Sequence, residues 1–121
     1  MKILVTGVKG QLGYDVMKVL HQSDAACLGA DIEDFDITDA AATAAFIERY
    51  APDAVIHCSA YTAVDRAEEE AALCERVNVD GARNIAAACK KIGAKMVYIS
   101  TDYVFPGTGE RFYETDDPIG P

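Results

Sequence analysis

The sequence predicts an α/β fold with a doubly wound parallel sheet, because short aliphatic runs alternate with stretches of helical periodicity along its 121 residues. Parallel strands in such an order need crossover helices that cover both faces of the sheet. The chain is 50% hydrophobic, which excludes a disordered protein, and its length fits one domain. We therefore expect a single α/β domain.

The first part of the chain predicts two strands with a helix between them. Aliphatic runs at 3–5 and 25–30 are the expected strands. The helix between them is expected to turn inward a stripe of apolar residues at helical spacing, namely Leu12, Val16, Val19 and Leu20. Asp36 and Ile37 are interpreted as the stub of a short third strand.

The rest of the chain continues the alternation. Thr38 is the expected N-cap of a helix to Tyr50, whose buried side carries Phe46, Ile47 and Tyr50. Further strands are expected at 54–58 and 95–100. Segment 70–92 is expected to form one helix with a buried stripe of Leu73, Val77, Gly81, Ile85, Cys89 and Ile92. Gly93 would end that helix, and a loop is expected after residue 101.

A glycine motif joins the first strand to the first helix, with Gly7, Gly10 and Gly13 at a regular spacing. Gly7 permits the tight turn, Gly10 lets the backbone approach the phosphates of a dinucleotide, and Gly13 lets the helix lie close to the strand. The N–H groups at the start of the helix attract the anion. Because the motif follows an N-terminal strand directly, it predicts a Rossmann-type domain.

An acidic residue at the end of the second strand completes this pattern. Asp31 stands roughly 20 residues after the glycines, where a carboxylate binds the adenosine ribose. A carboxylate there repels a 2′-phosphate and favours NAD over NADP, whereas Lys9 in the glycine loop could attract that phosphate. The alternative, that Asp31 is a solvated carboxylate in an acidic segment, stays open.

Composition excludes several other classes of function. The net charge of −9 argues against binding of polymeric nucleic acid or of an anionic membrane surface. No apolar stretch has the length of a signal peptide or a membrane span. The spacing of the cysteines fits neither a zinc site nor a disulfide framework, so buried free thiols are expected at Cys27, Cys58, Cys74 and Cys89. We expect a cytoplasmic protein without a metal, and a homo-oligomer stays open.

Four loops are expected to meet at one edge of the sheet. Ligands of open α/β sheets bind beyond the carboxyl ends of the strands. The glycine loop, Asp31 and the segments 58–65 and 100–105 all emerge at that edge. The sequence therefore predicts one cleft built from these loops.

Two longer motifs carry more information than the glycines: Cys58-Ser59-Ala60-Tyr61-Thr62-Ala63-Val64-Asp65-Arg66-Ala67-Glu68 and Ser100-Thr101-Asp102-Tyr103-Val104-Phe105-Pro106-Gly107. Together with Gly7-x-x-Gly10-Gln11-Leu12-Gly13 they closely resemble the dTDP-4-dehydrorhamnose reductases, a family of extended short-chain dehydrogenases/reductases. The likeness covers essentially the whole chain. It implies that NADH or NADPH delivers hydride to the C4 ketone of a dTDP-linked sugar, dTDP-4-dehydro-L-rhamnose, to give dTDP-L-rhamnose.

The resemblance also implies roles for individual residues. Cofactor contacts are implied at the pyrophosphate for Gly10, Gln11 and Leu12, at the adenosine ribose for Asp31, and at the adenine for Asp36 and Ile37. Ala60, Tyr61 and Thr62 would line the nicotinamide side, and Thr62 and Val64 would reach toward the sugar nucleotide. Thr101 matches the catalytic hydroxyl of the family, and Asp102 and Tyr103 match its substrate-contacting residues.

One part of the family pattern is missing from these 121 residues. The proton donor of the superfamily is the tyrosine of a Tyr-x-x-x-Lys motif, and the one such motif here, Tyr14 to Lys18, lies in the first helix beside the glycine loop. It is interpreted as a surface pair. We therefore expect residues 1–121 to be an incomplete NAD(P)-binding domain, without the C-terminal strands and the substrate domain, and inactive by itself.

Two other functions stay open. One is a non-catalytic binding protein, like a regulatory subunit of methionine adenosyltransferase that shares this fold. The other is a reductase or epimerase for another nucleotide sugar. Among single residues, His57 and His21 are expected to be structural, and Asn78 is expected either to brace the active-site backbone or to pack as an ordinary helix residue.

Overall fold

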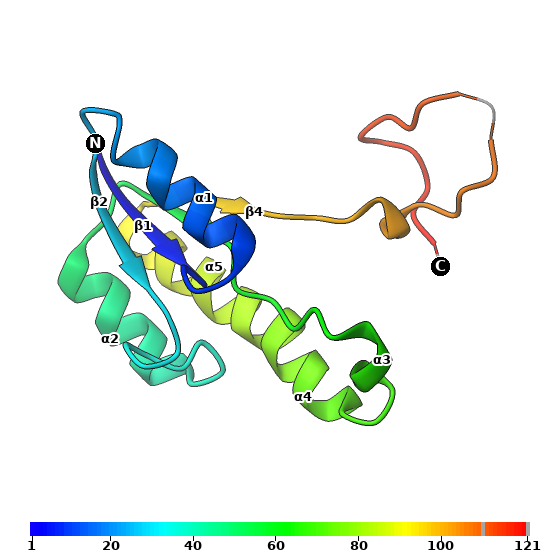
Figure 1. Cartoon of the computed structure of the whole chain (residues 1–121), viewed down its shortest axis with the longest axis horizontal. Coiled ribbons are helices and arrows are strands. Elements are labelled where there is room, and N and C mark those ends of the chain that lie inside the picture. The colour runs from blue at the N-terminus through cyan, green and yellow to red at the C-terminus, as the bar shows by residue number, and fades with distance from the viewer. Residues whose placement is uncertain (110, 121) are drawn as a thin grey trace.

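Four parallel strands form the centre of the computed structural model, which describes residues 1–109 and 111–120 but not the side chain of Val64 (Figure 1). The strands are β1 (Lys2–Thr6), β2 (Ala26–Ala30), β3 (Ala54–His57) and β4 (Lys95–Tyr98). Their order in the sheet is β2-β1-β3-β4. The predicted α/β fold with a parallel sheet is confirmed.

Helices lie on both faces of this sheet (Figure 1). Gly29 of β2 faces Met17 of α1 (Gln11–Leu20), whereas its neighbour Ala30 packs in a core cluster with residues of α2 (Ala40–Tyr50) and α5 (Ala82–Ile92). Successive residues of a strand point to opposite faces, so α1 covers one face, and α2 with α5 covers the other. The shorter helices are α3 (Val64–Ala67), α4 (Ala71–Glu75), the π-helical η1 (Arg76–Gly81) and the 3₁₀-helical η2 (Asp102–Val104).

The hydrophobic core lies between the sheet and the α2–α5 layer. Leu4, Ile47, Val55 and Ile85 are fully buried there, and Phe35 stacks on Phe46 at its rim. Each of the four aliphatic side chains contributes about 1.5–3 kcal/mol by its removal from water. Truncation of Leu4 to alanine would also leave a cavity and cost about 2–5 kcal/mol.

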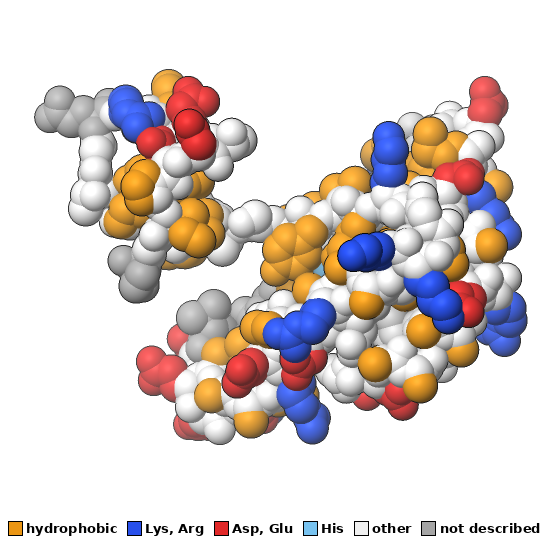
Figure 2. Space-filling view, turned by 180° about the vertical axis from the view of Figure 1, so that it is seen from behind, with side chains coloured by type: hydrophobic (Ala, Val, Ile, Leu, Met, Phe, Trp, Pro, Cys, Tyr) orange, Lys and Arg blue, Asp and Glu red, His pale blue; other side chains and the backbone are white. Residues whose placement is uncertain are grey.

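The other face of the sheet is covered much less than expected. Of the predicted inward stripe of α1, Leu12 and Val19 are 45% and 66% exposed, and Val16 and Leu20 are only half-buried. Tyr98 and Ile99 at the end of β4 are also exposed. Hydrophobic side chains gather at the surface where the body of the domain meets the C-terminal segment (Figure 2). The spacing of apolar residues predicts which side of α1 is apolar. That side becomes buried only where another part of a protein packs against it.

The start of α2 differs from the prediction. Asp39, not Thr38, is the N-cap, and its carboxylate accepts the N–H of Ala42 at 2.9 Å. Asp36 and Ile37 form no strand, because the Asp36 carboxylate accepts the N–H of Thr38 at 2.8 Å and closes a turn instead. The predicted third strand and the predicted cap are therefore wrong.

The long helical segment contains a π-helical turn that periodicity did not predict. Residues spaced four apart drift by roughly 40° per step around an α-helix. The wider turn of η1 lies within this run, between α4 and α5. Gly81, Ile85 and Cys89 are buried, whereas Leu73 is exposed and Val77 is half-buried. Gly93 ends the segment in the left-handed region, with φ of 74°, as expected.

Beyond β4 the chain leaves the sheet and forms a separate loop (Figure 1). Within it, Phe105 stacks on Tyr113 with ring centroids 4.5 Å apart. The N–H of Gly120 donates to the carbonyl of Val104 at 3.1 Å. Thr101 caps η2, so a short helical turn begins the predicted loop.

Candidate functional site

Two neighbouring cavities open along the carboxyl edge of the sheet, where ligands bind in open α/β folds. The first has a volume of about 430 Å³ and lies among the ends of β1 and β2, the glycine loop and the segment after β3. The second, of about 1030 Å³, lies among α1, the end of β3 and the segment after β4. Gly10, Cys58, Ser59 and Ala60 line both cavities, so the two form one elongated cleft.

The structure brings most of the predicted site residues to this cleft. Those that line the first cavity are Gly7, Gly10, Asp31, Ile37 and Ala60. Those that line the second are Gly10, Gln11, Leu12, Ala60, Thr62, Thr101 and Tyr103. Four do not line either cavity, namely Gly13, Asp36, Tyr61 and Asp102, and the side chain of Val64 lies outside the described part of the chain.

The glycine loop is a close-packed turn at the start of α1. Gly7 has φ of 72°, and a Cβ there would lie 2.7 Å from the backbone nitrogen of Ser59. A Cβ on Gly13 would lie 2.2 Å from the Gly7 carbonyl oxygen. Gly10 is the N-cap residue, and no side chain within the described residues caps the helix. Gly10, Gln11 and Leu12 line the second cavity, so the uncapped start of α1 can hold an anion there.

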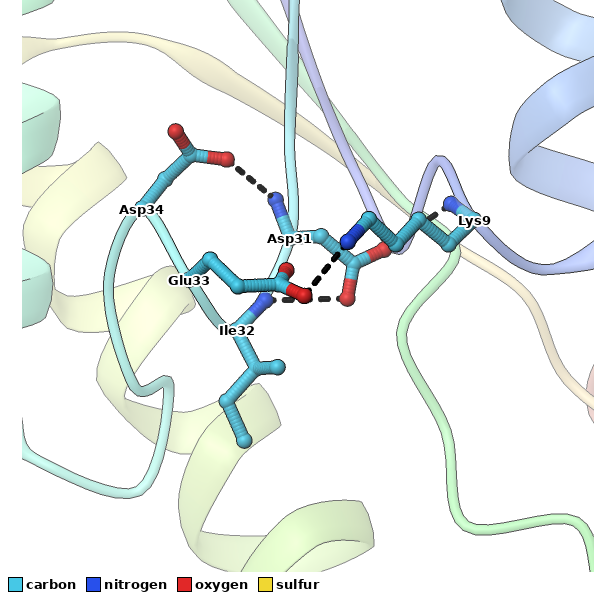
Figure 3. A network of polar contacts seen from close by, with 5 residues as sticks. All are labelled: Lys9, Asp31, Ile32, Glu33 and Asp34. Carbon is cyan, nitrogen blue, oxygen red and sulfur yellow. Dashed lines mark hydrogen bonds and ion pairs between the residues drawn. The ribbon is translucent and has the colours of Figure 1, made fainter.

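Asp31 ties this loop to the end of β2 (Figure 3). One carboxylate oxygen accepts the backbone N–H of Lys9 at 2.9 Å, and the other accepts that of Ile32 at 2.9 Å. The carboxylate of Asp34 accepts the N–H of Asp31 in turn, also at 2.9 Å. Asp31 thus holds the two segments that flank the first cavity and presents its charge at the rim.

Lys9 does not stand free in the loop. Its ammonium group donates a hydrogen bond to the carboxylate of Glu33 (Figure 3). That hydrogen bond is the main reason why the pKa of Lys9 is raised and the pKa of Glu33 is lowered. The sequence indicated Glu33 only as part of an acidic segment, and the pairing was not predicted.

The wall of the first cavity beyond Asp31 is held partly by Thr43 and Asn84, which the sequence did not single out. The Ile37 carbonyl accepts a hydrogen bond from the Asn84 side chain at 2.9 Å and one from the buried Thr43 hydroxyl at 3.3 Å. Gly81 gives Ile37 room, because a Cβ there would lie 2.7 Å from its Cδ1 atom. A buried hydroxyl on a predicted apolar helix face was the signal that could have identified Thr43.

Asn78 on η1 braces the segment after β3. Its side chain accepts the N–H of Tyr61 at 2.8 Å and donates to the carbonyl of Tyr61 at 3.1 Å. Of the two interpretations of Asn78, the structure supports the brace. The Tyr61 phenol donates to Glu70, which raises the pKa of Tyr61 and turns the ring to the α3–α4 corner. Only the backbone of Tyr61 is thus placed beside the cleft.

Replacement of Asn78 by alanine should loosen this segment. The two backbone groups of Tyr61 would lose their partner, at a cost of about 1–3 kcal/mol in unfolding free energy. Amide hydrogen exchange at Tyr61 should therefore become faster in Asn78→Ala. The matched control is Asn84→Ala, which releases the Ile37 carbonyl instead and should leave exchange at Tyr61 at the wild-type rate. Equal exchange at Tyr61 in both variants would contradict a brace by Asn78.

His57 lies at the floor of the second cavity. It is 2% exposed, its Nδ1 atom lies 2.8 Å from the Thr6 hydroxyl, and its ring lies over that of Tyr98 with centroids 6.1 Å apart. Burial lowers the pKa of His57 from its usual 6.5. These contacts agree with the structural role expected for His57.

Acid should destabilise the fold through His57. Its pKa is lower in the folded than in the unfolded chain, so the unfolded state binds more protons as the pH falls below about 6.5. The stability present above that pH is then progressively lost. Thermal unfolding of wild type and His57→Asn at about pH 7.5 and about pH 5.5 should show a smaller acid loss in the variant. An equal acid loss in the two proteins would contradict the role of His57.

Thr101 stands at the mouth of the second cavity. Its hydroxyl oxygen accepts the N–H of Tyr103 at 3.3 Å and lies 3.3 Å from a carboxylate oxygen of Asp102, to which it donates. Tyr103 is 86% exposed. Tyr14 and Lys18 are exposed on α1, as predicted for a surface pair.

Several other site types find no support in the described part of the chain. Residues 1–109 and 111–120 contain no group of three or more His, Cys, Asp or Glu that could hold a metal ion. No helix among them is both long and apolar enough to span a membrane. The four cysteines are free, but only Cys89 is buried, so the expectation of four buried thiols was too broad.

The fold and the cleft define a Rossmann-type α/β domain. The chain belongs to the family described as RmlD substrate binding domain, which matches residues 1–121. A dTDP-4-dehydrorhamnose reductase of Streptomyces griseus is 45% identical over 118 residues, which cover 98% of this chain and 39% of that protein. The resemblance that the sequence motifs indicated is therefore confirmed.

Solved structures agree with this assignment. A dTDP-4-dehydrorhamnose reductase from Clostridium acetobutylicum superposes with a TM-score of 0.93 at 41% identity, covering 100% of this chain and 43% of that one. The reductase from Bacillus anthracis, solved in complex with NADP, has a TM-score of 0.93 at 38% identity and covers 99% and 43%. The chain thus spans 39–43% of the length of these proteins.

Proposed function

We propose that this chain is the NAD(P)H-binding part of a reductase that converts dTDP-4-dehydro-L-rhamnose to dTDP-L-rhamnose. The observation that carries the proposal is the cleft, in which the glycine loop, Asp31 and the two family motifs meet at one sheet edge. The similarity to reductases of this name and to an NADP complex supports it.

In this proposal the first cavity takes the adenosine half of the cofactor. The N–H groups of Gln11 and Leu12, beside Gly10, hold the pyrophosphate, because a helix start without a side-chain cap offers unpaired donors. Asp31 accepts from the ribose hydroxyls and Ile37 packs on the adenine. Asp36 remains part of the adenine proposal, although its carboxylate is bonded within its own turn.

The second cavity takes the nicotinamide and the sugar nucleotide. Ala60, Thr62 and the backbone of Tyr61 form the side that Asn78 holds in place. Thr101 and Tyr103 line the opposite wall. Val64 and Asp102 complete the proposed substrate contacts. A cavity of about 1030 Å³ has room for a nicotinamide and a hexose together.

The chemistry requires a hydride, a donor at the ketone oxygen and a proton. A bound reduced nicotinamide supplies the hydride. Negative charge develops on the C4 oxygen, and in this proposal the Thr101 hydroxyl turns from Asp102, to which it donates in the structure, and donates to that oxygen. The proton comes from a tyrosine of a Tyr-x-x-x-Lys motif, which residues 1–121 do not supply at this edge.

The test uses the full-length protein with dTDP-4-dehydro-L-rhamnose and either NADH or NADPH. We expect oxidation of the reduced nicotinamide, measured by absorbance, and formation of dTDP-L-rhamnose, identified by NMR. Nucleotide binding without turnover of any dTDP-ketosugar would instead favour the regulatory function. Turnover only with sugars linked to another nucleotide would favour a reductase or epimerase for another nucleotide sugar.

A further inference from the structure

We infer that Glu33 sets the choice between NADH and NADPH by holding Lys9 in an ion pair at the rim of the adenosine cavity. The inference rests on the proposed function, since it concerns the ribose end of the same cleft. It adds a specificity residue to that site and gives Lys9 two states, paired with Glu33 or paired with a phosphate.

The geometry brings both side chains to the position of the ribose. Lys9 and Asp31 line the cavity, and the Lys9 backbone N–H donates to the Asp31 carboxylate at 2.9 Å. A ribose bound by Asp31 therefore places its 2′ substituent near the Lys9 side chain. Glu33 follows Asp31 by two residues and reaches across to the Lys9 ammonium group (Figure 3). The pair lies beside Asp31, where a 2′-phosphate would be received.

The charges at this rim oppose a phosphate as long as the pair is closed. Lys9 is the cation of the network, and Asp31, Glu33 and Asp34 are its anions. A 2′-phosphate must take Lys9 from Glu33 and then lie beside the released carboxylate. NADH carries only a 2′-hydroxyl at this position, so it binds without releasing Lys9 and without placing a phosphate beside Glu33. Glu33 thus acts against NADPH in two ways, by occupying the cation and by repelling the phosphate.

The exposure of the pair makes it suitable for mutation. The side chains of Lys9 and Glu33 are 67% and 61% exposed, and an ion pair in water adds little to stability. Glu33→Gln keeps a hydrogen-bond acceptor for Lys9 and removes one charge. The matched control is Glu48→Gln, since Glu48 pairs with Lys91 at 2.6 Å on the α2–α5 layer and lines neither cavity. Both variants change the net charge equally.

The experiment measures dissociation constants of NADH and NADPH by nicotinamide fluorescence, with full-length protein at low ionic strength. Glu33→Gln should tighten NADPH about three- to tenfold and leave NADH within about twofold, as expected for one charge removed near a phosphate in water. Glu48→Gln should change neither. Lys9→Gln should weaken NADPH binding. In that background Glu33→Gln should increase the affinity for NADPH by less, because no cation remains to be released.

The outcomes separate this inference from the proposed function. If both nucleotides bind and Glu33→Gln leaves their ratio unchanged, Glu33 does not set specificity and the proposed function stands. If Glu33→Gln tightens NADPH binding equally in the wild-type and Lys9→Gln backgrounds, Glu33 acts only by repelling the phosphate, and its ion pair with Lys9 does not set specificity. If wild type binds neither nucleotide, the proposed function itself fails.

Discussion

Replacement of Gly10 by valine is expected to abolish nucleotide binding while the domain still folds. Gly10 lines both cavities, and in the proposed complex its backbone lies against the pyrophosphate. A branched side chain would keep the phosphates from the N–H groups of α1. Loss of two charge-assisted hydrogen bonds, at about 1.5–3 kcal/mol each, weakens binding roughly 100-fold or more.

The apo protein should tolerate this change. Gly10 has φ of −78°, which any residue adopts, and a Cβ there would meet only the Gly7 carbonyl oxygen, at 3.3 Å. We expect a loss of less than about 2 kcal/mol in unfolding free energy, from the poorer N-cap and a small overlap. Denaturant unfolding and nucleotide titration of the full-length variant check the two parts.

Gly13→Ala is the contrasting variant. Its Cβ would lie 2.2 Å from the Gly7 carbonyl oxygen and 2.9 Å from the Val8 Cα atom, so backbone must move. We expect a loss of about 3 kcal/mol or more in stability, before any ligand is added. If Gly10→Val binds NADPH as wild type does, the pyrophosphate does not lie over the glycine loop, and the cofactor proposal is wrong.

The glycine loop is the part of the candidate site that could be predicted best from the sequence. The motif places Gly7, Gly10 and Gly13 between a strand and a helix, and that context suffices to predict the turn and the cleft. Asp31 was placed correctly at the end of β2 for the same reason, since it follows an aliphatic run. The position of a residue directly after a predicted strand thus predicts those parts of the site that lie within a single loop.

Contacts between distant segments could not be predicted in this way. Asn78 reaches Tyr61 from a π-helical turn, and a stripe spaced four apart does not distinguish that turn from a regular helix. Lys9 meets Glu33 across 24 residues, and a charge run does not show which of its members faces the glycine loop. Asp39 replaced Thr38 as the cap, because both residue types favour that position.

In the proposed reductase reaction, replacement of Thr101 by valine is expected to lower kcat about 100- to 1000-fold, the usual cost of losing a donor at a developing oxyanion. Valine has the shape of threonine without its hydroxyl. Thr101 lines the second cavity and not the first, so the dissociation constant of NADPH should stay within about twofold of wild type. The measurement compares steady-state turnover of dTDP-4-dehydro-L-rhamnose with nucleotide titration on the same full-length preparations.

Thr101→Ser is the matched control, because serine also carries a hydroxyl. The hydroxyl also accepts the N–H of Tyr103 and caps η2, so its loss loosens the neighbouring turn by about 0.5–2 kcal/mol. Serine keeps both the cap and the donor, and its kcat should stay within about tenfold of wild type. Turnover by Thr101→Val near the wild-type rate would contradict the proposal that Thr101 donates to the ketone oxygen.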